Sequence, residues 1–313
     1  MDNNNILLSI CIPTFNRAHH LEATINSIVK QKRFQETNDV EIVISDNCSV
    51  DETMQVSDKF KDIFGDKIRY FRNSENIKDA NFEKVLSLGK GVFLKLNNDT
   101  LLHKDDTLDK IIELIIKNIE NKDIIFFSNG ALKNITKSKC LNLDSFVKTV
   151  SFNSTWIVCF GIWKKDFDSI DGFSRNANLQ LVQTDVLFRL ISSGRSVLVD
   201  NTQLFNSVPP ASKGGYNIYQ VFVTNYLGLV ENYSQGKKIS RVTLFNEKSK
   251  LFIHFLIPWT LAIWGDKTRY AFEKKGYLKI IIKKYIFHPV LYIGIIYLIL
   301  KFTLTKFKSY FNK

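Results

Sequence analysis

Short apolar runs alternate with segments of helical periodicity over the first 130 residues of the chain. The apolar runs are too short for helices and are bounded by turn-forming residues, which is typical of buried strands. Strands that alternate with helices indicate βαβ units, so we predict the α/β fold class, with a mixed, mainly parallel sheet flanked by helices. The predicted strands lie at 7–12, 40–44, 67–71, 92–96 and 123–127, and the predicted helices at 21–29, 51–64, 79–88 and 108–119.

The pattern becomes mixed beyond residue 130. We predict a strand at 156–163, a helix at 181–191 and a short strand at 196–200. The run Pro209-Pro210-Ala211-Ser212-Lys213-Gly214-Gly215 is the clearest loop of the chain. We divide the chain into a first domain at 1–205, a loop and helical connection at 206–250, and apolar, basic helices at 251–313.

The chain is long enough to bury a full core, because it has 313 residues and 45% of them are hydrophobic. Its four cysteines are scattered, so they predict neither a zinc site nor a disulfide framework, and they favour a reducing cytoplasm. The first five residues are polar and are not a basic segment followed by an apolar one. We therefore expect no secretory signal.

The net charge of +12 is concentrated near the C-terminus, where residues 267–313 contain eleven Lys or Arg and one acidic residue. Two apolar stretches, 251–264 and 285–300, are shorter than the roughly 18–20 residues of a spanning helix. A basic segment rich in aromatic and aliphatic residues favours attachment to an anionic membrane surface. A buried helix pair with solvated lysines and a true span at 285–300 remain the alternatives. We expect no nucleic acid partner.

Three predicted strands end in polar residues: Asn97-Asn98-Asp99-Thr100, Ser45-Asp46-Asn47, and Pro13-Thr14. In an open parallel sheet, ligands bind outside the carboxyl ends of the strands. This edge suits a nucleotide, with backbone around Pro13 for a base, Asp46 accepting from a base N–H, and Asp99 at the ribose or diphosphate. Ordinary turn chemistry is the alternative for the Asn97-Asn98-Asp99 ending. The glycine patterns of dinucleotide-binding and P-loop proteins do not occur in the sequence.

The run at 8–17, Leu-Ser-Ile-Cys-Ile-Pro-Thr-Phe-Asn-Arg, resembles the opening of the family 2 glycosyltransferases, which have the GT-A fold. Residues 43–53 are similar to that family's second motif, Asp-Asn or Asp-Asp followed by Ser-x-Asp-x-Thr. The resemblance covers about residues 6–200. Further matches follow in order at Asn76-Ile77, Asn81, Gly89-Lys90-Gly91, Asn98-Asp99, Phe160-Gly161-Ile162-Trp163, Asp171-Gly172-Phe173 and Gln183-Thr184-Asp185.

The resemblance implies transfer of a sugar from a nucleotide-diphospho-sugar to an acceptor hydroxyl, with inversion at the anomeric carbon. Asp99 stands where the family has its metal-binding Asp-x-Asp motif, which implies Mg²⁺ or Mn²⁺, and Asp185 stands where it has its catalytic base. The resemblance also makes 1–130 the nucleotide-sugar half and 131–205 the acceptor half of a GT-A domain. The residues that it assigns to donor binding are Pro13, Thr14, Asn16, Asp46, Asn81, Asn98 and Asp99.

Other roles are open for several of these acids. Asp185 is also suited to be a helix N-cap or a first-turn acid. Asp168 and Asp171 are fallback bases, because each lies near a turn that contains glycine. We expect Asp51 to cap the helix after the second strand and not to bind ligand.

The chain departs from the family at Asn97-Asn98-Asp99, where the family commonly has two or three acids. An Asn oxygen is a weaker, neutral ligand for Mg²⁺ or Mn²⁺. We therefore expect weak metal affinity, and Lys78 or Lys213 are candidates for stabilising the leaving group without a metal, although solvated surface lysine is the simpler role for both. The segment 213–216 either closes over a bound donor or only connects.

These features predict a bacterial-type glycosyltransferase on the cytoplasmic face of the plasma membrane, attached peripherally or as a monotopic protein. Its acceptor is expected to be a lipid-linked glycan in O-antigen, capsule or other surface polysaccharide synthesis. A protein acceptor is the enzymatic alternative. A non-catalytic nucleotide-sugar or glycan-binding protein on the same fold is the second class of function that fits.

Overall fold

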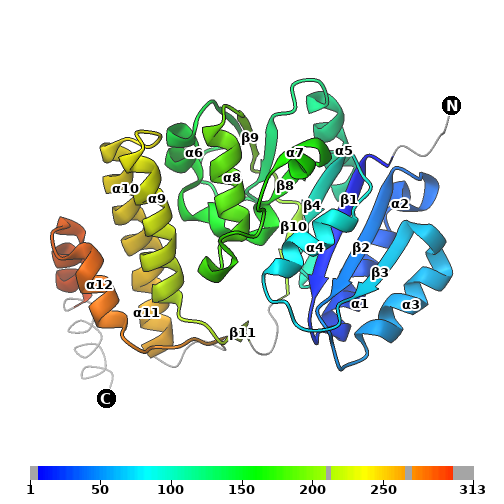
Figure 1. Cartoon of the computed structure of the whole chain (residues 1–313), viewed down its shortest axis with the longest axis horizontal. Coiled ribbons are helices and arrows are strands. Elements are labelled where there is room, and N and C mark those ends of the chain that lie inside the picture. The colour runs from blue at the N-terminus through cyan, green and yellow to red at the C-terminus, as the bar shows by residue number, and fades with distance from the viewer. Residues whose placement is uncertain (1–5, 209–212, 265–269, 299–313) are drawn as a thin grey trace, which may run out of the picture. The chain divides into compact units, whose positions relative to one another are not determined.

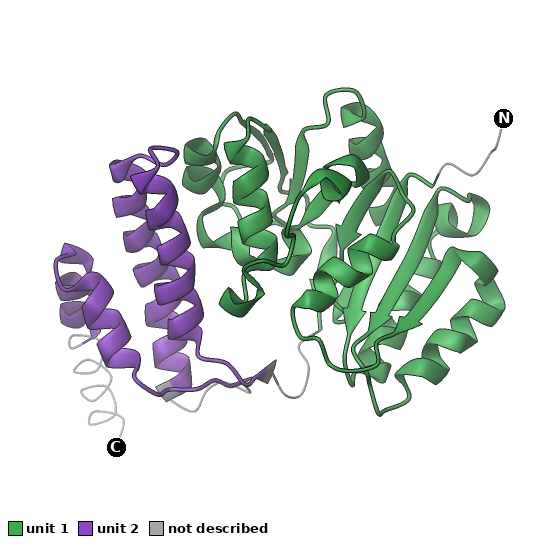
Figure 2. Cartoon of the chain, in the orientation of Figure 1, with its two compact units in different colours: residues 1–210 green, residues 211–313 purple. Residues whose placement is uncertain are grey.

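The computed structural model describes residues 6–208, 213–264 and 270–298. The chain forms two compact units, residues 1–210 and 211–313, which Figure 2 shows in different colours. The first unit combines sheets and helices, and the second is mainly helical.

A five-stranded sheet forms the centre of the first unit (Figure 1). Its strand order is β3-β2-β1-β4-β8; the first four strands are parallel, and β8 runs antiparallel to β4. The predicted mixed, mainly parallel sheet is confirmed. The strands are β1 Leu8–Thr14, β2 Val40–Asp46, β3 Ile68–Arg72, β4 Phe93–Leu96 and β8 Gly161–Trp163.

Helices flank this sheet, as its sequence pattern predicts. Helix α4 packs against β1 and β2, α3 packs against β3, and α1 packs against α3. Every residue of β2 and β4 is buried, which is expected of parallel strands that are covered on both faces. The helices of this region are α1 Ala18–Val29, α2 Lys32–Glu36, α3 Thr53–Phe64, α4 Ala80–Leu88 and α5 Thr107–Asn118, with the 3₁₀ turn η1 Gly65–Lys67.

The rest of the first unit contains two smaller sheets. In one, β6 pairs parallel with β9, and β9 pairs antiparallel with β7. In the other, β5 pairs antiparallel with β10. The strands are β5 Leu101–His103, β6 Ile124–Phe127, β7 Lys137–Cys140, β9 Val197–Asp200 and β10 Phe205–Ser207, and the helices and turns are α6 Leu143–Val150, η2 Ser151–Thr155, η3 Ile157–Cys159, α7 Lys164–Ser169, η4 Ala177–Leu179 and α8 Val182–Ser192.

The strand predicted at 156–163 is wrong over most of its length. Residues 157–159 form the 3₁₀ turn η3, and only Gly161–Trp163 is a strand. The N–H groups of Cys159 and Phe160 donate to the carbonyls of Trp156 and Ile157 respectively. Local turn bonds therefore replace ladder bonds, although the run is as apolar as a buried strand.

The second unit consists mainly of helices. Helices η5 and η6 have π-type hydrogen bonding, and residues 289–298 are also helical. Short strand β11 pairs parallel with β12, so Lys213-Gly214 lies in a strand pair. The elements are β11 Lys213–Gly214, η5 Gln220–Tyr226, α9 Leu227–Gln235, α10 Arg241–Leu251, η6 Phe252–Leu256, α11 Ile257–Trp264, β12 Tyr270–Ala271 and α12 Tyr277–Tyr285.

The apolar stretches at 251–264 and 285–300 both belong to the second unit. Over the part of the chain that the structure describes, no helix combines the length and the apolar character needed to cross a membrane. Residues 299 and 300, and the basic residues that follow them, lie outside the described residues.

Candidate functional site

The polar ends of β1, β2 and β4 lie next to one another, because these strands are neighbours and run parallel. Thr14 at the end of β1 is the register partner of Asp46 at the end of β2. On the other side of β1, the N–H of Asn97 donates to the carbonyl of Cys11 at 2.9 Å. The polar strand ends thus lie at one edge of the sheet, which contains Asp46, Asn98 and Asp99, and ligand binding at this edge stays a prediction.

Asp99 is a buried carboxylate that contacts groups from β1 and from the turn after it. Its side chain is 3% exposed, and Thr14 Oγ1 donates to Oδ2 at 2.9 Å. Arg17 Nη1 donates to Oδ1 at 3.0 Å. Burial raises the pKa of the Asp99 carboxyl, while the Arg17 guanidinium and the Thr14 hydroxyl oppose that rise. A guanidinium therefore already lies beside the acid expected to bind metal.

Asn97 is held by protein groups on both sides of its amide. Its Nδ2 donates to the carbonyl of Asn98 at 2.9 Å, and its Oδ1 lies 3.0 Å from Nε2 of His103. Burial, and then the charge of Lys95, lower the pKa of His103 to about 3, so this ring is neutral near pH 7. A neutral ring can carry its proton on Nε2 and donate it to Asn97. Asn97 is fully buried and shapes the turn that presents Asn98, which is half-buried, and Asp99.

Asp46 accepts two hydrogen bonds from its surroundings. The Ser49 N–H donates to Oδ1 at 2.9 Å, and the Tyr70 hydroxyl donates to Oδ2 at 2.7 Å. Arg72 lies farther off, with Nε 3.9 Å from Oδ2. A carboxylate has about four acceptor sites, so Asp46 has capacity for a ligand beside these two bonds. Its assignment to a nucleotide base stays a prediction.

Asn16 and Asn81 connect the loops around this edge. The Asn16 backbone has φ 51°, in the left-handed region that Asn tolerates, and its Oδ1 accepts from the N–H of Val50 at 2.8 Å. Asn81 is buried and donates to the carbonyl of Ser45 at 2.9 Å. It also accepts from the hydroxyl of Ser45 and from the amide of Asn73. Both residues fix loops at the edge, and their contact with a donor stays a prediction.

Asp51 is a helix-capping residue, as predicted. Its Oδ1 accepts from both the N–H and the hydroxyl of Thr53 at the start of α3. Its Oδ2 accepts from the N–H of Ala18 at the start of α1. One carboxylate thus caps two helices and joins the loops that follow β1 and β2.

The residues around Asp99 fit a divalent metal that a bound diphosphate would largely hold. Among the described residues, no three His, Cys, Asp or Glu side chains are grouped closely enough to hold an ion. Mg²⁺, however, usually takes one or two carboxylates together with substrate phosphates and water. Asp99 supplies one such carboxylate, and Arg17 already contacts Oδ1 of that carboxylate.

Asp185 forms a second cluster of charged groups, in the first turn of α8. Its carboxylate is 2% exposed, and Nε and Nη2 of Arg175 both lie 3.3 Å from it. Nε of Arg189 is 3.1 Å from Oδ2, without the alignment of a hydrogen bond. Arg175 is half exposed and Arg189 is nearly buried, so Arg175 is the partner of Asp185 with more freedom to move.

The fallback bases lie differently. Asp168 is exposed and pairs with Lys164 within α7. The backbone carbonyl of Asp171 accepts from Nη1 of Arg189 at 2.7 Å. Asp185 is therefore the buried member of the three candidate acids, and the arginine beside it also holds the loop that contains Asp171.

Lys95 connects β4 to the segment that precedes α8. Its ammonium donates to the carbonyls of Leu96 and Val158, and it is fully buried. Burial lowers the pKa of Lys95 to about 7. Nearby, Gln183 and Thr184 of α8 bond to the backbone of η2: Nε2 of Gln183 lies 2.5 Å from the carbonyl of Thr155. Strand β4 and the start of α8 are thus hydrogen-bonded to the same stretch, η2–η3.

Several residues of these clusters were not predicted from the sequence: Arg17, Tyr70, His103, Arg175 and Arg189. Arg17 follows the polar end of β1 directly, and Arg189 lies four residues after Asp185, a spacing that joins opposite charges on a helix. Those two signals are present in the sequence. The pairing of Tyr70 with Asp46 and of His103 with Asn97 depends on the tertiary fold and has no local signal.

Comparison with known proteins gives a family match over the first half of the chain. Residues 9–161 match the family described as Glycosyl transferase family 2. The chain is 41% identical over 102 residues to the abequosyltransferase RfbV of Salmonella typhimurium, across 32% of this chain and 30% of that protein. It is 26% identical over 102 residues to the poly(ribitol-phosphate) beta-N-acetylglucosaminyltransferase TarS of Staphylococcus aureus, across 32% of this chain and 18% of TarS. The matches span less than a third of the length of these two relatives.

Solved structures share the fold at low sequence identity. The crystal structure of TarS residues 1–349 in complex with UDP has a TM-score of 0.56 and 14% identity, covering 82% of this chain and 75% of that one. The mannosyltransferase PcManGT of Pyrobaculum calidifontis, solved with GDP-Man and Mn²⁺, has a TM-score of 0.53 and 14% identity, covering 83% and 73%. These likenesses are evidence of a common fold.

Proposed function

The chain carries a glycosyl transferase family 2 domain with the GT-A fold at residues 9–161, and we propose that it transfers a sugar from a nucleotide-diphospho-sugar to a glycan hydroxyl with inversion. The observation that carries this proposal is the edge formed by β1, β2 and β4. It brings Asp46, Thr14 and Asp99 together at the carboxyl ends of parallel strands, where α/β sheets bind ligands.

In the proposed reaction, Asp46 and the backbone around Pro13 bind the base and ribose of the donor. Asp99 lies at the diphosphate, where it would hold Mg²⁺ or Mn²⁺, and the metal would neutralise charge on the departing diphosphate. The mannosyltransferase that shares the fold was solved with Mn²⁺ and GDP-Man, which supports this assignment. Asn16, Asn81 and Asn98 shape the same edge.

Asp185 is the proposed general base. The acceptor oxygen forms a bond to the anomeric carbon while the bond from that carbon to the diphosphate oxygen breaks. The acceptor proton passes to the Asp185 carboxylate, and the electron pair of the broken bond leaves with the nucleoside diphosphate. Arg175 covers this carboxylate in the structure, and its half-exposed side chain can move when the acceptor binds.

We place the reaction at the cytoplasmic face of the plasma membrane, with a lipid-linked acceptor in O-antigen, capsule or related surface polysaccharide synthesis. The exposed apolar side chains and the lysines of the second unit support attachment to a membrane surface. By their names, one relative transfers abequose and another transfers N-acetylglucosamine to poly(ribitol-phosphate), and this polymeric acceptor of the second relative supports a polymer or glycan acceptor here.

The first test is a thermal-shift screen of the full chain with nucleotide sugars, with and without Mn²⁺, followed by donor hydrolysis and transfer with the donor that binds. Asp185→Asn is expected to lower turnover by about 10²–10⁴-fold while donor binding is retained. Asp168→Asn is the matched control, because it removes an exposed acid nearby in the sequence, and it is expected to retain turnover.

Two results would contradict the proposal. Equal losses from Asp185→Asn and Asp168→Asn would remove the base assignment. A donor that binds tightly but is never hydrolysed or transferred by the unmodified chain would favour the alternative, a nucleotide-sugar or glycan-binding protein on the same fold.

A further inference from the structure

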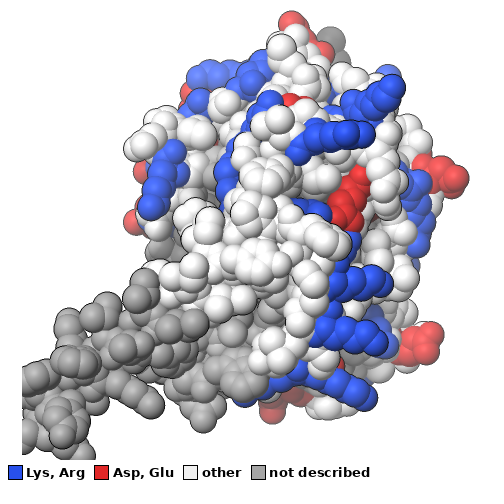
Figure 3. Space-filling view, turned by 90° about the vertical axis from the view of Figure 1, so that its left-hand side faces the viewer, with Lys and Arg blue, Asp and Glu red and all other residues white. Residues whose placement is uncertain are grey.

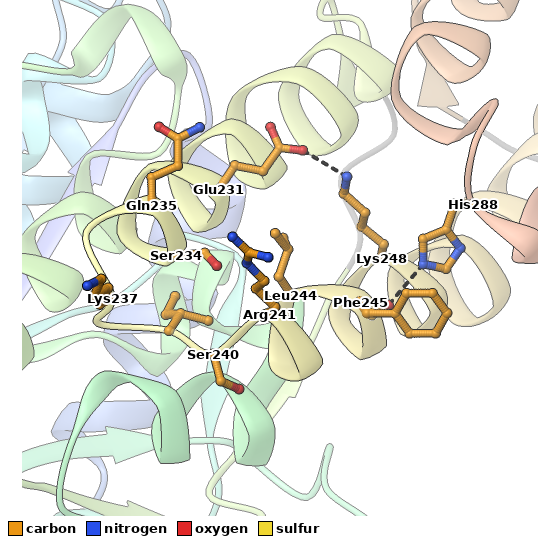
Figure 4. A pocket seen from close by; sticks show the side chains of 11 residues that line it. Glu231, Ser234, Gln235, Lys237, Ser240, Arg241, Leu244, Phe245, Lys248 and His288 are labelled. Atoms are coloured by element: carbon orange, nitrogen blue, oxygen red, sulfur yellow. Dashed lines mark hydrogen bonds and ion pairs between the residues drawn. The ribbon is translucent and has the colours of Figure 1, made fainter.

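A pocket of about 690 Å³ lies within the second unit, between α9, the turn after it, and α10 (Figure 4). Lys248 reaches from α10 toward Glu231 of α9, with Nζ 2.9 Å from Oε1. Lys237 in the turn and Arg241 at the start of α10 also line the pocket, and both are exposed. The pocket walls thus contain three cationic side chains and one carboxylate.

A second hollow, of about 350 Å³, adjoins the first and shares Glu231 and Lys248 with it. It adds Lys283 and Lys284 from α12, and Lys284 pairs with the other oxygen of Glu231. Glu231 therefore fixes two lysines at the junction of the hollows. The lysines and hydrogen bonds to them lower the pKa of its carboxyl, more than offsetting burial.

The charge of this joined pocket is strongly positive. Its five Lys and Arg side chains face a single carboxylate, so the formal balance is +4. His288 also lines both hollows, but burial lowers its pKa and its ring stacks on Phe245 at 4.3 Å between centroids, so it adds packing and no charge near pH 7. Such a balance suits a ligand that carries two or more negative charges, or several ligands with one each.

Exposed apolar side chains lie on α12 and on the residues that follow it, the segment that also supplies Lys283, Lys284 and Phe287 to the second hollow. Phe287, which lines the second hollow, is 98% exposed. On the face shown in Figure 3, Lys and Arg side chains flank a broad band of uncharged residues. Large contiguous apolar patches are rare on monomeric soluble proteins, and apolar side chains next to cations are typical of membrane-surface binding. The other exposed large apolar side chains described between residues 277 and 298 are Leu278, Ile282, Ile286, Tyr292, Ile293, Ile295, Ile296 and Tyr297.

We propose that this pocket binds the phosphate headgroup of an anionic phospholipid, while Phe287 and the exposed side chains of α12 enter the bilayer surface. Phosphate oxygens match the lysine and arginine donors, and acyl chains match the apolar side chains around them. A free phosphate would accept hydrogen bonds from the lysine and arginine side chains but would leave the apolar side chains exposed to water. The inference rests on the membrane location proposed above and gives it a defined site.

The test is co-sedimentation of the full chain with vesicles of phosphatidylcholine, with or without phosphatidylglycerol. The unmodified chain is expected to bind the vesicles that contain phosphatidylglycerol, and Lys237→Gln with Arg241→Gln is expected to weaken that binding by roughly 30-fold. Both residues are exposed, so the folded state should survive, which thermal melting checks. Phe287→Ala is expected to weaken binding severalfold through the apolar contact.

Lys274→Gln with Lys275→Gln is the matched control, because it removes the same charge from exposed positions of the same unit outside the pocket. Equal losses in the two double variants would show a diffuse charge effect and overturn the pocket. Binding of inorganic phosphate without binding to phosphatidylglycerol vesicles would also overturn it, because the occupant would then be a free anion.

Donor hydrolysis without vesicles separates this inference from the proposed function. Loss of vesicle binding in the pocket variant with normal hydrolysis supports the pocket. If Lys237→Gln with Arg241→Gln binds the vesicles as tightly as the unmodified chain, the inference is overturned and the transferase proposal is unaffected. If no donor is ever turned over but the pocket variant loses vesicle binding, the transferase proposal fails and the lipid site stands.

Discussion

The guanidinium of Arg17 lies 3.0 Å from Oδ1 of Asp99, so the acid at the end of the Asn97-Asn98-Asp99 turn has a cationic partner from the β1–α1 connection. Arg17 is 38% exposed, whereas Asp99 is 3% exposed, so the arginine is the partner that can move. A single carboxylate with a guanidinium beside it leaves this turn with little net negative charge for a divalent metal. It leads to a prediction about the metal.

Arg17 and a divalent metal are expected to compete for the same carboxylate. Arg17→Gln should therefore lower the Mn²⁺ concentration that half-saturates donor binding by about fivefold, which corresponds to about 1 kcal/mol for a partly exposed pair. Arg17→Lys, which keeps a cation, should change it less. Calorimetric Mn²⁺ titration in the presence of donor measures the effect. An increased Mn²⁺ requirement in Arg17→Gln would show that Arg17 binds the diphosphate and does not compete.

The two arginines beside Asp185 should contribute unequally to stability. Arg189 donates to the carbonyls of Asp171, Gly172 and Phe173 and is 14% exposed, so Arg189→Gln should cost about 2–4 kcal/mol. Arg175 is half exposed, and Arg175→Gln should cost less than about 1 kcal/mol. Urea unfolding of both variants gives the comparison. Similar costs would mean that Asp185 depends on both partners alike.

The parallel sheet could be predicted because each of its strands has a strong local pattern. Runs at 7–12, 40–44 and 92–96 are apolar and end in polar residues, and βαβ topology then brings those ends to one edge. Strands β5 and β10 have three residues each and carry no alternation, so only their pairing reveals them. The segment 156–163 was misassigned because apolar character does not separate a buried turn from a buried strand.

The side-chain partners of the site were harder to predict than its backbone. The sequence places Asp46, Asp99 and Asp185 at element ends, where local rules apply. The cation or hydrogen-bond donor that contacts each acid depends on residues that are far apart in the chain. Arg17 and Asp99, for example, are separated by 82 positions. Lys95 differs from these residues. The sequence shows a lysine within an apolar strand, but it does not show that the side chain is fully buried or which groups surround it.

Gly91 lies where β4 approaches β1, and a larger residue should not fit there. A Cβ at this position would lie 2.6 Å from the backbone nitrogen of Ser9 and 2.8 Å from the carbonyl carbon of Leu8. Gly91→Ala should therefore destabilise the chain by about 1–3 kcal/mol, since backbone cannot move aside cheaply. Gly228→Ala is the control: it faces open space within α9 and should stabilise by about 0.5–1 kcal/mol. Thermal unfolding measures the effect, and an equal decrease in the unfolding temperature of both variants would contradict this prediction.

Lys95 should make the stability of the chain depend on pH. It lies at 5.0 Å and 5.2 Å from the ring centroids of Phe127 and Phe205, and burial lowers its pKa to about 7 from an ordinary value of 10.5. Between these two values the unfolded state binds more protons than the folded state. The free energy of unfolding therefore rises with pH from about 7 to about 10.5, and the slope vanishes below that window.

The lysine-to-methionine change at this position removes the titrating group and keeps an unbranched side chain in the core. We compare the free energy of unfolding of the unmodified chain with that of Lys95→Met at each pH. The excess of the unmodified chain over the variant should grow by about 2 kcal/mol between pH 7.5 and pH 9, with a slope of up to about 1.4 kcal/mol per pH unit. Urea unfolding at both pH values measures it, and Lys90→Met controls for the loss of an exposed lysine before the same strand. A difference that stays constant, or that shrinks as pH rises, would show that Lys95 remains charged in the folded chain and that its carbonyl and ring contacts fully offset its burial.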